Sequence, residues 1–563
     1  MRLATFIFLV CVSFSHAQER VVPKAGQAGR SVTYAPHGIV ATSHPLAAEI
    51  GLDILKQGGN AMDAAIACNA AMGLMEPMSN GLGGDLYAIV WEAKTQKLYG
   101  LNASGRAPLK ATREFFASKG LKAIPESGPL SWNVPGCVDG WFTLHGKFGS
   151  VPMAKILQPS IDYAEKGYPV PEVIGRYYQA SRRYARDEDF AKIYMPNGKL
   201  PATGTLFKNP ALGRAFRLLA EKGRDGYYNG PIAESLIALS DRKGGLFQKA
   251  DFEKTRASWV EPVSTNYRGY DVWEIPPPGQ GIATLQMLNT LEKYDLKKMG
   301  PNSADYWHLL IESKKLAFAD RAKYYTDPDF EKVPVKELIS KEYAASRNKL
   351  ISMDKAMTDV AAGDAKIGKA DTIFLTVVDK DRNCVSLIQS NYMGFGSGLF
   401  CSDFGFSIQN RGTLFSLDPN HANKLEPGKR PFHTIIPALV TKNNKPVFCF
   451  GVMGGDMQPQ GHVEVLVNII DFGMNVQAAG ESPRIEHVGS ATPTGKPGDA
   501  NGGTCQVEVG IPDEVVAELT RRGHKINRVK TNSGGYQGIW IDWENDILQG
   551  ASESRKDGAA VGY

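Results

Sequence analysis

The chain has 563 residues, of which 43% are hydrophobic and 22% are charged. This composition supplies enough apolar material for a globular core, and it excludes a disordered or collagen-like chain. The net charge is +5 with no run of Lys or Arg, so the sequence lacks the electrostatic footprint of a nucleic-acid-binding protein.

Residues 1–17 have the organisation of a secretory signal peptide. Arg2 precedes a short apolar run that ends at Val12, and Ser15-His16-Ala17 precedes the expected cleavage point. The run is shorter than a typical membrane-spanning helix, although an uncleaved anchor is the alternative. We therefore expect an exported protein, periplasmic or secreted, without a stable membrane span.

Two helices and a hairpin are predicted early in the chain. Apolar residues recur with a helical period over 46–55, and two glycines then end that helix. Asn60 is placed to cap a second helix. The glycine-rich loop at 80–85 lacks the Lys-Ser/Thr of a nucleotide-binding loop, and residues 86–101 after it predict a β-hairpin.

A small, polar stretch over 351–370 predicts an exposed linker, and a second hairpin follows it. Its strands cover 372–378 and 384–390 and are joined by five polar residues. A loop that is symmetric about its central residue places Thr372 opposite Ser390. Directly opposed side chains have Cβ atoms about 4.5–5.5 Å apart, and a slip by one residue would separate them.

Thr372 is the candidate nucleophile. Cleavage between Asp371 and Thr372 would leave an α-amine beside the threonine hydroxyl. The reference pKa of an α-amine is about 7.7–8, which suits a general base near neutral pH. A threonine activated by its own amine is a known nucleophile, although a threonine that starts a strand more often has only a structural role.

Gly454 and Gly455 lie between an apolar strand, 446–450, and a helix expected after Pro459. Two backbone N–H groups at such a turn can stabilise an oxyanion, and a simple tight turn is the alternative. The sequence contains no G-x-S-x-G or H-E-x-x-H motif and no Cys/His spacing of a metal site, so we predict no metal and no cofactor. Three of the scattered cysteines lie in apolar segments and are predicted to be buried thiols: Cys68, Cys384 and Cys449.

Over roughly residues 36–563 the chain resembles the gamma-glutamyltransferase family. The matching motifs include Gly-Gly-Asn-Ala-Met-Asp-Ala-Ala at 58–65, Gly-Leu-Gly-Gly at 81–84, Asp371-Thr372, Pro-Gly-Lys-Arg-Pro at 427–431, Gly454-Gly455 and the C-terminal segment 557–563. The resemblance implies an N-terminal nucleophile hydrolase, an α+β protein folded as a four-layer αββα sandwich. It implies that the precursor cuts itself before Thr372, so that residues 18–371 form a large chain and residues 372–563 a small chain.

The same resemblance assigns roles to four residues. Thr372 is the nucleophile, Ser390 stands where the family has a threonine beside it, and Gly454 and Gly455 form the oxyanion hole. The implied partners are a small-molecule amide or γ-glutamyl substrate and the two chains of one precursor.

The acyl-binding positions depart from the family. Arg106 lies two residues from the usual arginine for the substrate α-carboxylate and is predicted to replace it, because a two-residue shift keeps the same face of an extended segment. The positions that normally hold the substrate α-amine are Arg411 and Leu414. The other candidate substrate-binding residues are Asn391, Tyr392, His433 and Thr434.

Two hypotheses about the substrate follow. The first is hydrolysis or acyl transfer from glutathione or another γ-glutamyl compound through an acyl-Thr intermediate. The second keeps this mechanism but takes an acyl group with a carboxylate and no α-amine, as in cephalosporin-acylase-like or oxamate-amidase-like relatives. Leu414 cannot accept a hydrogen bond from an ammonium group and Arg411 attracts a carboxylate, which favours the second unless Asp456 replaces the amine clamp. An exported binding protein that is never processed is a third reading, which the combination of Thr372, Ser390 and the glycine pair disfavours.

Overall fold

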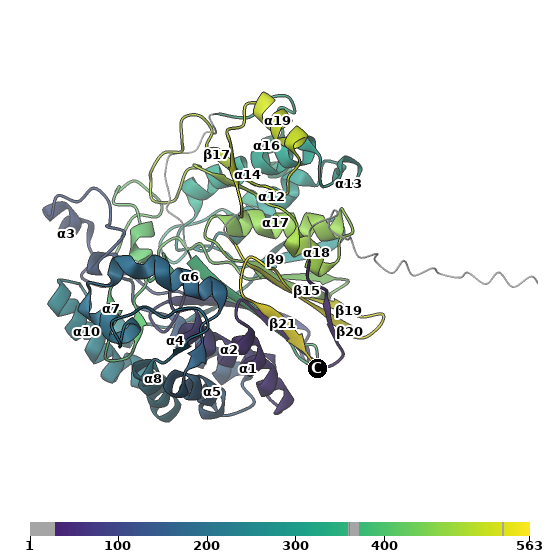
Figure 1. The fold of residues 1–563 in the computed structure, drawn as a ribbon. Coiled ribbons are helices and arrows are strands. Elements are labelled where there is room, and N and C mark those ends of the chain that lie inside the picture. The colour runs from purple at the N-terminus through teal and green to yellow at the C-terminus, as the bar shows by residue number, and fades with distance from the viewer. Residues whose placement is uncertain (1–28, 359, 361–370, 532–533) are drawn as a thin grey trace, which may run out of the picture.

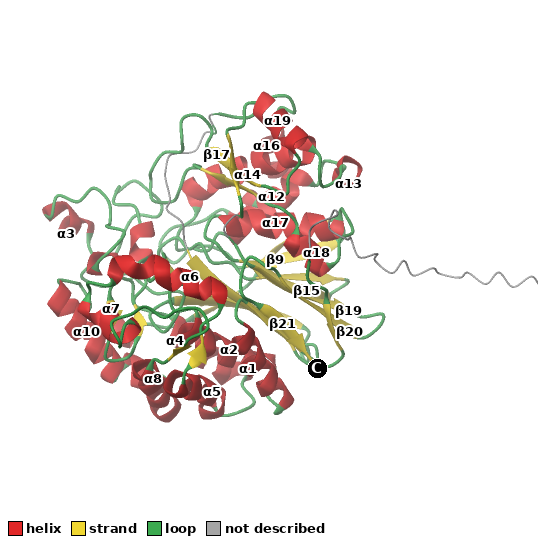
Figure 2. Ribbon diagram, in the orientation of Figure 1, coloured by secondary structure: helices red, strands yellow, loops and turns green. Residues whose placement is uncertain are grey.

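The computed structural model describes residues 29–358, 360, 371–531 and 534–563. Two seven-stranded sheets lie face to face, and helices cover the outer side of each (Figures 1 and 2). This is the four-layer αββα architecture expected from the sequence. The predicted signal peptide and most of the predicted linker lie outside the described residues.

We name the two sheets after β10 and β15, and neighbouring strands in both are antiparallel. In spatial order the β10 sheet contains β21 (Ala559–Gly562), β2 (Ile39–Thr42), β10 (Asp371–Val378), β11 (Cys384–Tyr392), β3 (Asp85–Glu92), β4 (Lys97–Ala103) and β7 (Ser258–Val260). The β15 sheet contains β1 (Thr33–Ala35), β20 (Ile547–Ser552), β19 (Tyr536–Asp542), β15 (Lys445–Val452), β14 (Ala438–Lys442), β9 (Tyr270–Glu274) and β8 (Val263–Tyr267). Each sheet takes strands from both sides of Thr372, so a cut there would leave two interleaved chains.

Helices from different parts of the chain cover the two sheets (Figure 1). The β10 sheet is covered by α1 (Pro45–Lys56), α2 (Ala61–Met75), α4 (Cys137–Phe148) and, behind them, α5 (Met153–Lys166) and α8 (Pro210–Lys222). The β15 sheet is covered by α12 (Gly281–Leu291), α17 (Met457–Ile470), α18 (Val476–Glu481) and, behind them, α14 (Ala304–Tyr324). Apolar side chains fill the space between the sheets and the space under each helical layer.

The early elements form as predicted. Helix α1 ends at Lys56, just before the paired glycines, and the side chain of Asn60 caps α2 by accepting hydrogen bonds from the N–H groups of Met62 and Asp63, both at 3.0 Å. Strands β3 and β4 form the predicted hairpin. Helix α17 begins at Met457 rather than after Pro459, because a proline is tolerated in the first turn of a helix.

The hairpin of β10 and β11 has the predicted register. Val378 pairs with Cys384, and Ile373 pairs with Gln389. An irregularity between Asp371 and Ile373 interrupts the ladder at Thr372, where two residues of β11, Ser390 and Asn391, stand opposite this one residue of β10 in a β-bulge. The prediction is therefore confirmed over 373–378, and the bulge in β11 lies opposite the candidate nucleophile.

Contacts between the sheets bring the end of β10 to the end of β15. The hydroxyl of Thr376 donates to the carbonyl oxygen of Cys449 at 3.5 Å. Phe374 packs so closely on Gly451 that a Cβ there would lie 2.5 Å from its ring. These contacts advance along β10 toward Thr372 and along β15 toward Gly454.

Two other expectations concern cysteines and membranes. In the described part of the chain every cysteine is a buried free thiol, as predicted for Cys68, Cys384 and Cys449. Among the helices of the described ranges, none has the length and apolar character needed to cross a membrane.

Candidate active site

The hydroxyl groups of Thr372 and Ser390 meet at the end of β10. Both side chains are buried, and Oγ1 of Thr372 donates to Oγ of Ser390 at 3.2 Å. The N–H of Tyr392 also donates to Oγ of Ser390, at 2.8 Å. Tyr392 has φ of 75°, a strained conformation for a bulky residue, and this turn directs its N–H back toward Ser390. Ser390 is thus fixed by the backbone while its hydroxyl contacts the candidate nucleophile.

Replacing Ser390 by alanine is expected to slow turnover about tenfold while the chain remains folded, because one hydrogen bond that orients Thr372 is lost. Steady-state hydrolysis and the rate of chain cleavage measure the effect. Ser386→Ala is the matched control, since Ser386 lies on the same face of β11, is equally buried and bonds the carbonyl of Phe450 at 3.3 Å instead. Equal rates for Ser390→Ala and the control would mean that the hydrogen bond between Ser390 and Thr372 contributes nothing to turnover or processing.

The glycine pair forms the turn from β15 into α17. Gly454 has φ of 107° and Gly455 has φ of 58°, both in the left-handed region that favours glycine. Their carbonyl oxygens accept from the N–H groups of Met457 and Gln458 at 3.0 and 3.2 Å. Within the described residues, neither glycine N–H has a hydrogen-bond acceptor. Two N–H groups at the N-terminus of a 14-residue helix therefore remain to bind an oxyanion.

Arg411 is fully buried and is only partly hydrogen-bonded. Its Nη1 donates to Oγ1 of Thr434 at 2.7 Å, and its guanidinium carbon lies 4.8 Å from the ring centre of Tyr392. Within the described residues, Nε and Nη2 have no hydrogen-bond partner. Burial lowers the pKa of Arg411 to about 10, so the group stays charged at neutral pH. A buried cation with two unpartnered nitrogens is a site for an anion.

The groups around Arg411 differ in charge: the carboxylate of Asp85 acts on it, whereas Leu414 and His433 are neutral. Leu414, in the same short 3-10 helix, is buried in an apolar cluster with Phe432. His433 Nε2 bonds the carboxylate of Asp85 at 2.9 Å, and burial lowers the pKa of His433 to about 4, so its ring is neutral at neutral pH. Asp85 itself pairs with Ser390 across the β10 sheet. Asp85 is thus a site-forming residue that sequence reasoning missed, although it directly follows the glycine-rich loop.

A buried hydrogen-bond network joins Thr434 to the glycine turn. Gln280 donates through Nε2 to the carbonyl oxygens of Thr434 and Gly455, at 2.6 and 2.8 Å. Its Oε1 accepts from Nη1 of Arg321 at 2.6 Å, and Arg321 binds both carboxylate oxygens of Asp456 at 2.6 and 3.2 Å. Burial opposes the charge of Asp456, but Arg321 outweighs it and lowers the pKa of that carboxyl. Sequence analysis missed Gln280 and Arg321, because no local motif marks either.

Two predicted substrate-binding residues lie outside this chain of contacts. Arg106 binds Asp329 at 3.1 Å, Asp327 at 3.7 Å and the carbonyl of Gly428 at 3.0 Å. Asn391 has other partners, because its Nδ2 donates to the carbonyl of Asn80 at 3.0 Å and to Ser407 at 3.1 Å. The structure therefore joins Thr372, Ser390, Tyr392, Arg411, Thr434 and Gly455 but leaves these two residues apart.

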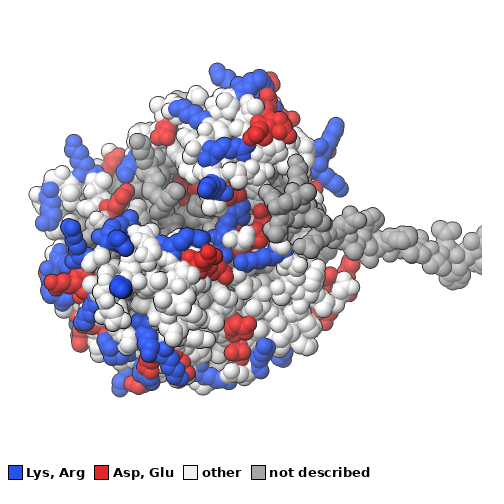
Figure 3. All heavy atoms as spheres, viewed as in Figure 1, with Lys and Arg blue, Asp and Glu red and all other residues white. Residues whose placement is uncertain are grey.

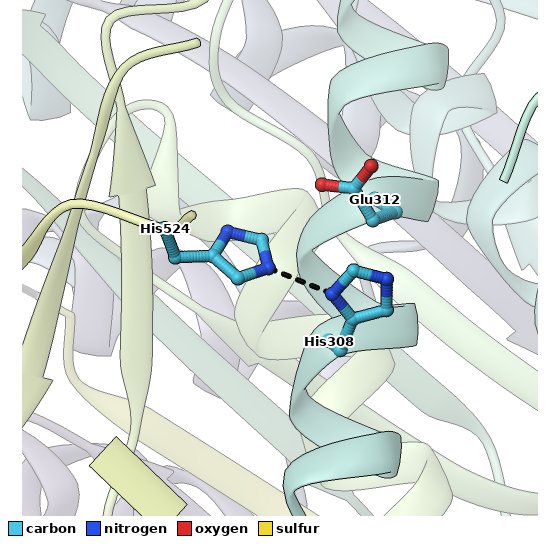
Figure 4. Close-up of side chains that lie close together, drawn as sticks. All are labelled: His308, Glu312 and His524. Atoms are coloured by element: carbon cyan, nitrogen blue, oxygen red, sulfur yellow. Dashed lines mark hydrogen bonds between the residues drawn. The ribbon is translucent and has the colours of Figure 1, made fainter. Parts of the chain in front are cut away.

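One cluster among the described residues has the donor set of a metal site, namely His308, Glu312 and His524 (Figure 4). Nε2 of His308 donates to the carbonyl of Ser352 at 2.7 Å, so its Nδ1 is free to accept from Nε2 of His524 at 2.8 Å. Glu312 is bonded by Lys315 at 2.8 Å and by the N–H of Met357 at 2.9 Å. These contacts satisfy the ligand atoms internally, and the neighbouring lysine opposes a further cation, so we assign no step of the chemistry to this cluster.

The molecular surface shows no strongly charged face in the view of Figure 3, where Lys and Arg side chains are interspersed with Asp and Glu. The same view shows a hollow between the two helical halves of the molecule.

Comparison with known proteins gives a consistent result. Residues 47–563 match the family model described as gamma-glutamyltranspeptidase. The chain is 36% identical over 529 residues to the glutathione hydrolase-like YwrD proenzyme of Bacillus subtilis, covering 93% of this chain and 98% of that protein. It is 33% identical over 574 residues to a glutathione hydrolase proenzyme of the same organism, covering 97% and 95%. The crystal structure of cephalosporin acylase from Bacillus halodurans superposes with a TM-score of 0.87 at 42% identity, covering 96% and 99%.

Proposed function

Because the chain belongs to the gamma-glutamyltranspeptidase family of N-terminal nucleophile hydrolases, we propose that it is a self-processing amide hydrolase with Thr372 as its nucleophile. Cleavage before Thr372 divides the precursor into a large chain, 18–371, and a small chain, 372–563. Residues 1–17 direct export and are removed. The two chains stay together because they share both sheets.

The reaction proceeds through an acyl-threonine. Oγ1 of Thr372 attacks the amide carbonyl, and the α-amine of Thr372 takes the hydroxyl proton. The N–H groups of Gly454 and Gly455 hold the oxyanion, and one such donor is worth about 10²–10³ in rate. The C–N bond then breaks, and the departing amine receives the proton from the α-amine. Water then attacks the ester carbonyl while the α-amine of Thr372 takes its proton. The ester bond breaks, Oγ1 of Thr372 receives that proton, and the acid is released.

The substrate that this site favours is an amide whose acyl group carries a free carboxylate and no α-amine. The observation that carries this proposal is Arg411, a fully buried guanidinium with two unpartnered nitrogens. Tyr392 contacts both Arg411, through its ring, and Ser390, through its N–H. A single residue therefore separates the guanidinium from the hydroxyl pair of Thr372 and Ser390. A dicarboxylic acid monoamide of glutaryl type is one member of this class.

Hydrolysis of matched anilides tests the proposal. Glutaryl p-nitroanilide is expected to be cleaved about ten to a hundred times faster than butyryl p-nitroanilide, which lacks only the carboxylate, because a charged hydrogen bond contributes about 1.5–3 kcal/mol. Release of p-nitroaniline under identical conditions gives the ratio. Equal rates for the two substrates would contradict a carboxylate-binding role for Arg411.

A γ-glutamyl substrate such as glutathione is the second candidate. The carboxylate of Asp456 lies beside the glycine turn and keeps 22% of its side chain exposed, so it can receive an ammonium group. Its two oxygens already bind Arg321, which weakens that attraction. We therefore rank the γ-glutamyl substrate below the glutaryl type.

A further inference from the structure

Gln280 occupies an unusual position between the two halves of the site. It precedes the first residue of α12 and is completely buried. Its carboxamide makes three short hydrogen bonds, to the carbonyl oxygens of Thr434 and Gly455 and to the guanidinium of Arg321. None of these partners is near Gln280 in the sequence, so the fold alone brings them together.

The chemistry of the partners fixes the orientation of this amide. Arg321 can only donate, so Oε1 must face it, and the two carbonyl oxygens can only accept, so they must face Nε2. Both N–H bonds of Nε2 are therefore used. A flipped amide would place like groups together at all three contacts, and the side chain has one stable arrangement.

The two carbonyls belong to the two functional parts of the site. Thr434 accepts from Nη1 of Arg411 at 2.7 Å, and Gly455 is one of the two glycines whose N–H groups bind the oxyanion in the proposed function. Arg321 fixes the same turn from the other side through Asp456. Gln280 thus connects Thr434, which bonds Arg411, directly to the turn at Gly454 and Gly455.

We propose that Gln280 is a positioning residue that determines the acyl-chain length of the substrate. The proposal rests on the proposed function, since the substrate carboxylate binds Arg411 while its reacting carbonyl lies in the oxyanion hole. The distance between Arg411 and the oxyanion hole then determines how many carbons fit between the carboxylate and the amide of the substrate. A shift of about 1 Å in a bound substrate costs about 10²-fold in rate, so a rigid bridge converts a small length difference into selectivity.

The test is a chain-length profile. The substrates are the mono-p-nitroanilides of oxalic, succinic, glutaric and adipic acids, each with one free carboxylate. Their kcat and KM are measured for the wild type and for Gln280→Asn. The wild type is expected to show a sharp maximum at one length. The asparagine side chain is one methylene shorter and cannot reach both carbonyls, so kcat for the best substrate should fall about tenfold or more and the ratio between best and next-best length should shrink by a similar factor.

Gln286→Asn is the matched control. Gln286 lies on the same helix, is also buried and bonds Asp320 at 2.8 Å and Tyr325 at 2.6 Å, away from the site. Its substitution should leave the profile unchanged. If Gln280→Asn fails to fold, Thr434→Val provides a second test, because it cuts the bridge at the hydroxyl that holds Arg411 and should flatten the same profile.

Two outcomes would overturn the inference in distinguishable ways. A uniform loss over all chain lengths, in either variant, would show that Gln280 has no part in length selection, and it would leave the proposed function intact. A wild-type enzyme that cleaves carboxylate-free butyryl p-nitroanilide as well as every dicarboxylic monoamide would overturn both the inference and the proposed function.

Discussion

Thr372→Ala is expected to remain a single polypeptide with no measurable amide hydrolysis. The substitution removes the only oxygen that our account uses for attack, both in processing and in turnover, so the loss is complete rather than partial. Denaturing gel electrophoresis and p-nitroanilide hydrolysis measure the two effects. In the wild type, Edman degradation of the small chain should begin Thr-Ile-Phe-Leu.

Thr376→Ala is the control for this experiment. Thr376 is buried on the same strand and the same face as Thr372, and its hydroxyl bonds the carbonyl of Cys449. The control should still be processed and remain active. Cleavage of Thr372→Ala at the same position, or a different first residue on the wild-type small chain, would contradict the assignment of Thr372.

Arg411→Gln should remove most of the preference for a substrate carboxylate. Glutamine is uncharged, so the rate for glutaryl p-nitroanilide should fall about ten- to a hundredfold while the rate for butyryl p-nitroanilide changes little. Adding Leu414→Asp should shift the preference toward γ-glutamyl p-nitroanilide, because a carboxylate then stands where an ammonium group can bind.

Arg106→Gln is the matched control for this prediction. Arg106 already binds two aspartates and a backbone carbonyl, so its loss should affect glutaryl and butyryl anilides equally. If Arg106→Gln, rather than Arg411→Gln, abolishes the preference for glutaryl, then the carboxylate binds at Arg106 as the sequence resemblance first implied.

The hairpin of β10 and β11 could be predicted from the sequence because the pattern that specifies it is local. A five-residue loop and the period of two along a strand define the register of β10 and β11, and the contact between Thr372 and Ser390 follows from it. The bulge in β11 opposite Thr372 could not be foreseen, since it arises at the end of the ladder, where the loop length no longer constrains the pairing. The four-layer architecture came from the family resemblance rather than from periodicity.

The acyl-binding region could be predicted only in part. The exchange at Arg411 and Leu414 is visible in the sequence, but the unpartnered nitrogens of Arg411 emerge only from tertiary packing. The bridge through Gln280 joins residues more than 150 positions apart, and His433 meets Asp85 across 348 positions. Such contacts depend on how the two sheets stack, which no local pattern specifies.

The most direct test of the central claim is the ratio of kcat/KM for glutaryl p-nitroanilide to that for γ-glutamyl p-nitroanilide with the processed wild-type enzyme. These substrates differ only in the α-amino group, which Leu414 cannot bind and Arg411 repels. Our account predicts that the glutaryl substrate is cleaved at least as well as the γ-glutamyl substrate. A preference for the γ-glutamyl substrate of about a hundredfold, equivalent to about 2.8 kcal/mol, would show that an amine clamp exists elsewhere in the site and would contradict the account.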